Sequence, residues 1–138
     1  MPGLFDSLEL GSIELPNRVV MAPLTRARAG FEAVPNELMA AYYSQRAGAG
    51  LIITEGNFIS RDAAGYIHVP GLFTPEQTEG WRAVTKAVHD QGGKIFAQIA
   101  HCGAVSHRDF HAGLAPLAPS AVNPLEMTFT PGQSVGRS

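Results

Sequence analysis

Three short apolar segments separated by two amphipathic ones restrict the fold of this chain more than any other feature. The apolar segments, residues 19–22, 51–56 and 94–100, have the length and composition of strands. The second reads LIITEG, a run typical of strands that are buried on both faces of a parallel sheet. The order of strand, helix, strand, helix and strand predicts parallel strands joined by right-handed crossovers.

The first helical segment lies between the first two strands. Pro35 is expected to open it, because a proline at the first helical position loses no hydrogen bond. Gly48 or Gly50 can end it. Residues at i, i+3, i+4 and i+7 are predicted to form its mostly apolar inward stripe: Leu38, Ala41, Tyr42 and Gln45.

The second helical segment begins clearly at the sequence TPEQ. Thr74 can cap the helix, Pro75 occupies the first helical position and Gln77 completes a capping box. Gly92 and Gly93 are expected to stop it. Its predicted inward stripe consists of Trp81, Val84, Thr85 and Val88. Tryptophan and tyrosine residues on both helices are expected to pack in the core: Tyr42, Tyr43 and Trp81.

The intervals between the three strands are typical of a TIM barrel, which needs roughly 250 residues to close its (β/α)8 ring. We therefore predict an α/β fold, in which the chain supplies an N-terminal hairpin, residues 4–15, and roughly the first three β/α units of such a barrel. Residues 1–138 are expected to form the N-terminal part of one domain, with the remaining strands outside this chain. Residues 103–138 suit neither helix nor strand, and we expect a long loop or cap region there.

The composition argues against several classes of partner. The chain is 45% hydrophobic and 16% charged with a formal net charge of −2, so nothing indicates nucleic acid or an anionic membrane. Its apolar runs are too short to span a bilayer, and the N-terminus lacks the regions of a signal peptide. Cys102 is the only cysteine, which excludes an internal disulfide. A cytoplasmic location is therefore expected.

Small and polar residues stand at the ends of the three predicted strands, where TIM barrels carry their chemistry. Thr25 offers a hydroxyl after the first strand, and Gln98 offers an amide that can pair with a heterocyclic imide edge. Gly56 has no side chain, so a flat ligand can approach the second strand closely. Pro23 and Leu24 add an apolar wall. The set suits one face and one edge of a planar polar heterocycle.

Each of these residues also has a purely structural interpretation. A threonine after a strand can cap a helix or turn, a strand glutamine can be a satisfied amide, and a strand glycine often marks a bulge. Composition and spacing leave both interpretations open.

Two further groups of residues are interpreted as structural. The spacing of His101, Cys102, His107 and His111 matches no strong metal template, so we predict no metal site, and Cys102 is expected to be a small buried hydrophobe. Arg26 and Arg28 are expected to orient the first loop through salt bridges with carboxylates such as Glu55.

Five blocks of the sequence resemble the Old Yellow Enzyme family of FMN-dependent ene reductases. The resemblance reaches to about Ala121, and its blocks follow one another in the family's order. They read NRVVMAPLTRARA, YYSQRAGAGLIITEGNFIS, GYIHVPGLFTPEQ, VHDQGGKIFAQIAH and PLAPSA. The resemblance implies a TIM barrel that carries FMN at its strand ends.

The resemblance also implies roles for individual residues. Thr25 would hydrogen-bond near the flavin C4 carbonyl and so tune the flavin potential, Gln98 would pair with the pyrimidine edge, and Tyr66 would border the substrate pocket. The implied cofactor-binding residues are Ala22, Pro23, Leu24, Thr25, Gly56 and Gln98. The implied reaction is the reduction of an activated C=C bond, such as that of an enone, by NAD(P)H, with hydride transfer through flavin N5.

The chain departs from the family after the glutamine. Many members have a QLWH segment, where this chain reads QIAH; Ala100 in place of tryptophan is expected to widen the substrate pocket. Gly103-Ala104 follows without the family's arginine. The family's carbonyl-binding pair, proton-donating tyrosine, flavin-proximal arginine and phosphate-binding loops are expected beyond residue 138.

Alternatives from other classes remain open. The chain could be a structural piece that is inactive alone and is completed by a second polypeptide carrying the rest of the barrel. It could also belong to a related flavin barrel that catalyses isomerisation or oxidation in a biosynthetic pathway. A homo-oligomer agrees with the sequence as well.

Overall fold

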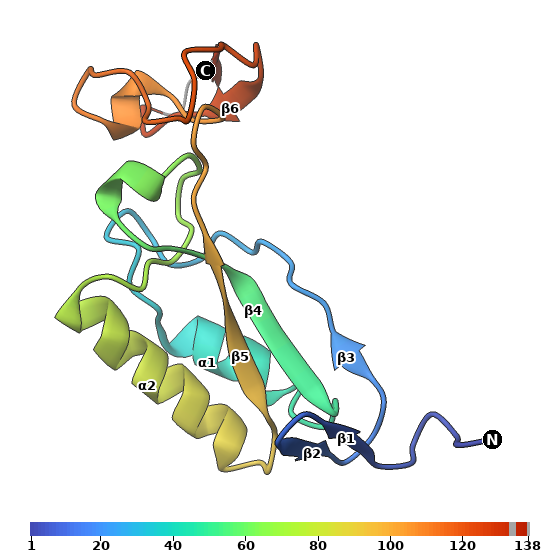
Figure 1. Ribbon diagram of the computed structural model, residues 1–138. Coiled ribbons are helices and arrows are strands. Elements are labelled where there is room, and N and C mark those ends of the chain that lie inside the picture. Colours follow the sequence, from blue (N-terminus) through green and yellow to red (C-terminus); the bar gives the residue numbers. More distant parts are fainter. Residues whose placement is uncertain (133–134, 138) are drawn as a thin grey trace.

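A three-stranded parallel sheet lies at the centre of the computed structural model, which describes residues 1–132 and 135–137 (Figure 1). Its strands, in spatial order, are β3 (Val20–Met21), β4 (Leu51–Phe58) and β5 (Ile95–Ala100). Two helices, α1 (Glu37–Ser44) and α2 (Pro75–His89), connect them. The predicted strand and helix order and the parallel pairing are confirmed.

The main core lies between the sheet and the two helices. In-register residues of the three strands, Met21, Ile52 and Ile95, face the helices. The helices contribute buried side chains to the same cluster: Met39, Tyr43, Trp81, Val84 and Val88. The opposite face of the sheet is open, and Val20 and Phe96 are 47% and 51% exposed there. One face of the sheet is therefore packed, while the other presents apolar side chains to solvent.

The first strand is shorter than predicted, because only Val20 and Met21 pair with β4 and residues 19 and 22 lie outside the strand. Asn17 Oδ1 accepts hydrogen bonds from the backbone N–H groups of Val19 (3.1 Å) and Gly50 (2.8 Å). These two bonds align the start of β3 with the start of β4. Beyond Met21 the chain leaves the ladder and turns toward Glu55, whose side chain binds the following loop.

Helix α1 begins at a different residue from the one predicted, and it buries a different face. Asn36 is its N-cap and accepts from the Met39 amide at 3.2 Å, so Pro35 precedes the cap rather than opening the helix. The helix ends at Ser44, before the expected glycines. The predicted inward stripe is wrong, since Leu38 is 62% exposed while Met39 and Tyr43 are buried. The stretch LMAAYY is apolar all round, so its periodicity selects no face.

Helix α2 matches the prediction at its start and along its inward stripe. The Thr74 side chain accepts from the Gln77 amide at 3.2 Å, and Gln77 Oε1 accepts from the Thr74 amide at 3.2 Å, which is a complete capping box. Trp81, Val84 and Val88 are buried, and Thr85, the fourth residue of the predicted stripe, is half-buried. The helix ends at His89, and Gly92 follows with a φ of +76°, a left-handed conformation that suits glycine.

Short elements lie before and after the sheet. The expected N-terminal hairpin is formed by β1 (Leu8–Leu10) and β2 (Ile13–Leu15). Short 3-10 helices follow β4 and β5, η1 (Arg61–Ala63) and η2 (Arg108–Phe110).

The prediction that residues 103–138 hold neither helix nor strand is wrong in two places. Besides η2, the antiparallel strands β6 (Met127–Phe129) and β7 (Val135–Arg137) form a hairpin. Gln133, Ser134 and Ser138 belong to the predicted loop and lie outside the described residues. Pro124 and Pro131 flank β6 and obscured so short a strand in the sequence. Every helix in the described part of the chain is too short or too polar to cross a bilayer.

Candidate functional site

The carboxyl ends of β3, β4 and β5 meet at one edge of the sheet, because the strands are parallel (Figure 1). The register pairs Gly56 of β4 with Gln98 of β5 and Phe58 with Ala100. A Cβ atom placed on Gly56 would lie 3.3 Å from Ala100 Cβ and 3.6 Å from Gln98 Oε1. The side chains of Gln98 and Ala100 therefore converge over the bare backbone of Gly56.

A bulge in β4 precedes this point. The register with β5 shifts between Ile53 and Gly56, so β4 carries one more residue than β5 there. The interpretation of Gly56 as a bulge marker is thus confirmed, and the bulge also delivers its backbone to the edge of the sheet. Thr54, Glu55 and Asn57 are buried beside it.

Buried polar groups of β4 hold the backbone of Gln98. Thr54 Oγ1 accepts from the Gln98 amide at 3.1 Å, and Asn57 Nδ2 donates to the Gln98 carbonyl at 2.9 Å. Asn57 Nδ2 also donates to Thr54 Oγ1 at 2.9 Å. Both bonds from β4 involve the backbone of Gln98, and its side chain is exposed. Sequence reasoning missed Thr54 and Asn57, although polar residues inside an apolar strand are the signal that could have found them.

The segment after β3 brings Pro23, Leu24 and Thr25 to the same edge in irregular backbone. Thr25 and Leu24 are exposed and Pro23 is half-buried. The structural interpretation of Thr25 as a helix cap is wrong, because Asn36 caps the following helix. Ala22, the other predicted contact, precedes Pro23 and is exposed.

Glu55 holds this segment through backbone groups. Its Oε2 atom accepts from the amides of Arg26 at 2.9 Å and Ala27 at 3.1 Å. Within residues 1–132 and 135–137, the expected salt bridges of Arg26 and Arg28 with Glu55 are not formed. The Arg28 guanidinium instead donates to the carbonyls of Arg26 and Ala27 at 2.8 and 3.0 Å.

Tyr66 follows β4 and is exposed. It lines a cavity of about 680 Å³ between the loops that follow β3 and β4 and the start of α2, together with Phe31 and His68. Thr25, Gly56 and Gln98 do not line that cavity. The structure therefore brings Gly56, Gln98 and Ala100 together, and a place for Tyr66 beside a substrate stays a prediction.

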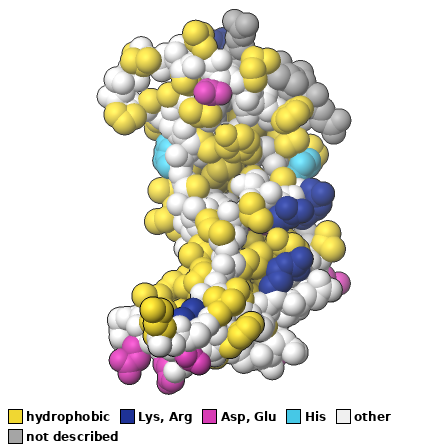
Figure 2. All heavy atoms as spheres, turned by 90° about the vertical axis from the view of Figure 1, so that its right-hand side faces the viewer, with side chains coloured by type: hydrophobic (Ala, Val, Ile, Leu, Met, Phe, Trp, Pro, Cys, Tyr) yellow, Lys and Arg dark blue, Asp and Glu magenta, His cyan; other side chains and the backbone are white. Residues whose placement is uncertain are grey.

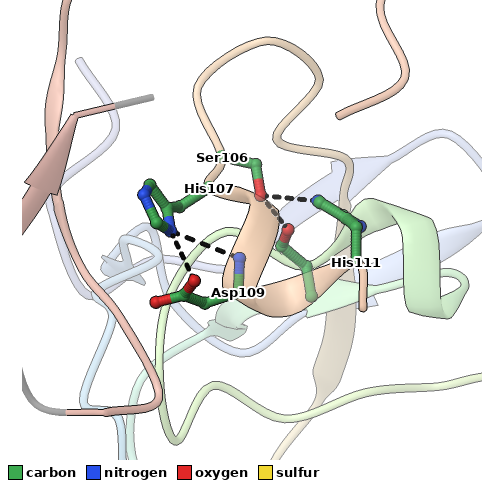
Figure 3. Close-up of polar contacts among 5 residues, drawn as sticks. Ser106, His107, Asp109 and His111 are labelled. Carbon is green, nitrogen blue, oxygen red and sulfur yellow. Dashed lines mark hydrogen bonds and ion pairs between the residues drawn. The ribbon is translucent and has the colours of Figure 1, made fainter. Parts of the chain in front are cut away.

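Two of the histidines after β5, His107 and His111, each have a local partner (Figure 3). The Ser106 hydroxyl donates to the Ala64 carbonyl at 2.6 Å and lies 2.8 Å from His111 Nε2, so its proton is already engaged. His107 Nδ1 accepts from the Asp109 amide at 3.2 Å and lies 3.3 Å from Asp109 Oδ1. Among the described residues, no group of three or more His, Cys, Asp or Glu side chains could hold a metal ion.

Two side chains, Cys102 and Tyr43, have raised pKa values and structural roles. Burial raises the pKa of the Cys102 thiol, which is half-buried and packs where a Gly65 side chain would lie. Burial also raises the pKa of the Tyr43 hydroxyl, whose oxygen accepts from the Glu55 amide at 2.9 Å. Neither group has the exposed, activating surroundings of a nucleophile or general base.

Comparison with curated proteins gives close relatives over most of the chain. A flavin oxidoreductase of Emericella nidulans, hxnT, is 51% identical over 124 residues, which are 86% of this chain and 32% of the relative. A probable flavin mononucleotide-dependent alkene reductase of Leishmania infantum is 45% identical over 120 residues, 86% of this chain and 33% of the relative. The chain thus spans about a third of the length of these relatives.

Solved structures agree with the sequence relatives. Morphinone reductase in complex with tetrahydroNAD superposes with a TM-score of 0.90 at 46% identity, covering 100% of this chain and 39% of that one. The Old Yellow Enzyme homologue of Zymomonas mobilis superposes with a TM-score of 0.89 at 43% identity, covering 99% of this chain and 39% of that one. The predicted α/β class and the assignment to part of a TIM barrel are confirmed.

The family model described as "NADH:flavin oxidoreductase / NADH oxidase family" matches residues 3–133, nearly the whole chain. Together with the structural matches, this confirms the resemblance drawn from the five sequence blocks. The chain belongs to the NADH:flavin oxidoreductase / NADH oxidase family, in the group of Old Yellow Enzyme homologues.

Proposed function

We propose that this chain is part of an FMN-dependent oxidoreductase that reduces activated C=C bonds with NAD(P)H. The observation that supports the proposal is the convergence of Gln98 and Ala100 over Gly56, at the strand edge where the resemblance to the family implies a flavin. A side chain at position 56 would fill this space, and glycine leaves it open to a flat ring.

The residues at this edge fit an isoalloxazine ring by their chemistry. The exposed amide of Gln98 can donate to and accept from the imide edge of the pyrimidine. Gly56 leaves room for one face of the ring, and Pro23 and Leu24 supply an apolar wall. Thr25 places a hydroxyl donor in the same segment. Ala22 would add a backbone contact at the end of β3.

The chemistry that FMN supplies when bound is hydride transfer, from a reduced nicotinamide to the β-carbon of an activated alkene. The residues of this chain bind and orient the ring and tune its electronics. Ala100, next to Gly56, is proposed to border a wide substrate pocket, and Tyr66 to lie on its other side. The substrate class is therefore a small molecule with an activated alkene.

The rest of the catalytic machinery is proposed to lie outside residues 1–138. We place these residues in the N-terminal part of one FMN-binding barrel, whose further strands either continue the chain or belong to a second polypeptide. The open edge of β5 supports such a completion. The cytoplasmic location expected from the sequence remains a prediction.

The test is an anaerobic spectroscopic titration of the complete protein. After loading with FMN, addition of NADH or NADPH should abolish the flavin absorbance, and a cyclic enone should restore it with formation of the saturated ketone. A protein that takes up no FMN would contradict the proposal. Flavin reduction without reoxidation by any enone would instead favour the isomerisation or oxidation alternative.

A further inference from the structure

Glu55 is a buried carboxyl group in the middle of the sheet. It is 1% exposed and lies in the bulge of β4, directly before Gly56. Burying a carboxyl group is unfavourable unless hydrogen bonds or charges compensate for the lost water. The Glu55 carboxyl group therefore needs hydrogen-bond partners within the protein, and these partners indicate its role.

The partners of Glu55 belong to the loop after β3 and to α1. Oε2 accepts from two consecutive amides, those of Arg26 (2.9 Å) and Ala27 (3.1 Å). These residues directly follow Thr25. The backbone amide of Glu55 donates to Tyr43 Oη at 2.9 Å, which ties the same residue to α1. Ala27 has a φ of +51°, an uncommon conformation for a residue with a side chain, so this turn needs such an external anchor.

The second carboxyl oxygen has no partner of its own in the described part of the chain, and Glu55 also lines a small cavity. Glu55 Oε1 is buried and has no hydrogen-bond partner among the described residues. Glu55 lines a cavity of about 160 Å³ together with Arg26, Arg28 and Tyr42. The Arg26 guanidinium lies 5.6 Å from the centroid of the Tyr42 ring.

We infer that Glu55 is a positioning residue, which fixes the segment Pro23–Thr25 and thereby aims the Thr25 hydroxyl. The inference rests on the proposed function, in which Thr25 tunes the flavin. One oxygen holding two consecutive amides fixes the position of the turn that ends this segment. Because Gly56 is the next residue of β4, the same anchor sets the distance between the Thr25 segment and the Gly56–Gln98 pair.

The test compares three holoenzyme variants. Glu55→Gln keeps a carbonyl acceptor, Glu55→Leu removes it, and both remove the charge, so any long-range electrostatic effect on the flavin is common to the two. Relative to Glu55→Gln, Glu55→Leu should exchange the Arg26 and Ala27 amide hydrogens at least tenfold faster and have a lower flavin midpoint potential. Ile52→Val is the matched control, since Ile52 is buried in the same strand but packs against the helices.

A double-mutant comparison tests whether Glu55 affects the flavin midpoint potential through Thr25. The difference in potential between Glu55→Leu and Glu55→Gln should vanish when Thr25→Ala is present in both. If Glu55→Leu does not fold, Glu55→Asp serves instead: it keeps the charge but withdraws the oxygens by one methylene. The Asp variant should show faster exchange at residues 26 and 27 and a lower potential than the unaltered protein.

The outcomes separate this inference from the proposed function. Equal amide exchange in Glu55→Leu and Glu55→Gln, or a potential difference that persists with Thr25→Ala, would overturn the positioning role. An unaltered protein that binds no FMN would overturn the proposed function and the flavin part of this inference. Amide exchange in the FMN-free protein still decides whether Glu55 anchors the loop.

Discussion

At the scale of single residues, the candidate site combines rigid backbone with exposed side-chain groups. Thr54 and Asn57 of β4 bind the backbone N–H and carbonyl of Gln98, while the side-chain amide of Gln98 is exposed. The loop that carries Thr25 is held at Glu55 rather than by the hydroxyl itself. This division lets a side chain be replaced with little change to the fold, so substitutions at Gln98 and Thr25 report on ligand contacts.

The Gln98→Leu variant should bind FMN more weakly, because the polar pyrimidine edge loses its partner. We expect a loss of about 1–3 kcal/mol, which is roughly 5- to 150-fold in dissociation constant. Titration of the complete apoprotein with FMN, followed by flavin fluorescence, measures it. Gln91→Leu, an exposed glutamine in the turn after α2, is the matched control and should bind FMN normally. Unchanged affinity in Gln98→Leu would remove Gln98 from the site.

The Thr25→Ala variant should keep its flavin but have a lower midpoint potential. Loss of the hydroxyl donor destabilises the electron-rich reduced ring, so reduction by nicotinamide becomes less favourable and reoxidation by substrate more favourable. Spectroelectrochemistry of the holoenzyme gives the potential. Thr78→Ala, at an exposed position of α2, provides the control. A potential that stays the same or rises in Thr25→Ala contradicts the assigned role.

The Ala100→Trp variant should discriminate between substrates by size. Ala100 Cβ lies next to the bare backbone of Gly56, so an indole there would occupy space above the proposed ring. We expect kcat/KM to fall selectively for bulky β-substituted enones and to change little for small cyclic enones. Steady-state kinetics with both classes provides the measurement. An equal loss for both, or none for either, would show that Ala100 does not border the substrate.

At the scale of elements, the two helices approach each other closely where α2 passes the start of α1. A Cβ atom on Gly80 of α2 would lie 2.6 Å from the Pro35 carbonyl oxygen. Pro35 is buried and precedes the N-cap Asn36. The glycine therefore allows the close contact that lets Met39 and Tyr43 pack against Trp81 in one cluster.

The Gly80→Ala variant should be less stable, although alanine is the better helix former by about 1 kcal/mol. The added methyl has to displace backbone, and such overpacking costs about 1–3 kcal/mol. Denaturant unfolding of the holoenzyme measures the difference. Gly48→Ala is the matched control, since nothing lies within 4 Å of a Cβ there. A stabilised Gly80→Ala variant would mean that the helices do not meet as described.

At the scale of the whole molecule, the sheet is covered on one side only. Helices pack on one face, and β5 pairs with β4 alone among the described strands. Phe96 and Ile99 of β5 are 51% and 67% exposed. Hydrophobic side chains also gather in the middle of the face in Figure 2, which views the molecule from the right-hand side of Figure 1. An open strand edge beside exposed apolar groups invites pairing with further strands.

A polypeptide of residues 1–138 alone should be poorly soluble or partly folded, colourless and unable to reduce enones. In such a polypeptide the barrel core would lack the layers contributed by later strands, and the phosphate site of such barrels lies near strands seven and eight. Adding a polypeptide with the remaining strands should restore a cooperative melt and the flavin absorbance. Size-exclusion chromatography with absorbance detection provides the readout. A soluble, monomeric, yellow 138-residue chain that reduces enones unaided would refute this.

The sequence by itself determined the features that depend on neighbouring residues. The capping box of Thr74 and Gln77 involves groups three positions apart, so its pattern is legible before folding. The apolar run of β4 and the strand–helix alternation likewise predicted the parallel sheet. Because parallel strands end at one edge, the positions of Gly56 and Gln98 beside each other followed from the strand order.

Only the tertiary structure decided the features that depend on residues far apart in the chain. The inward face of α1 is selected by Trp81 and Ile52, which are distant in sequence, because the helix is apolar all round. The hydrogen bonds of Glu55 come from backbone amides 28 and 29 residues away. From its charge we expected salt bridges with arginine side chains, but its partners are these backbone N–H groups. A local pattern fixes which hydrogen bonds neighbours can make, whereas a buried polar group takes its partner from whatever the folded chain brings within reach.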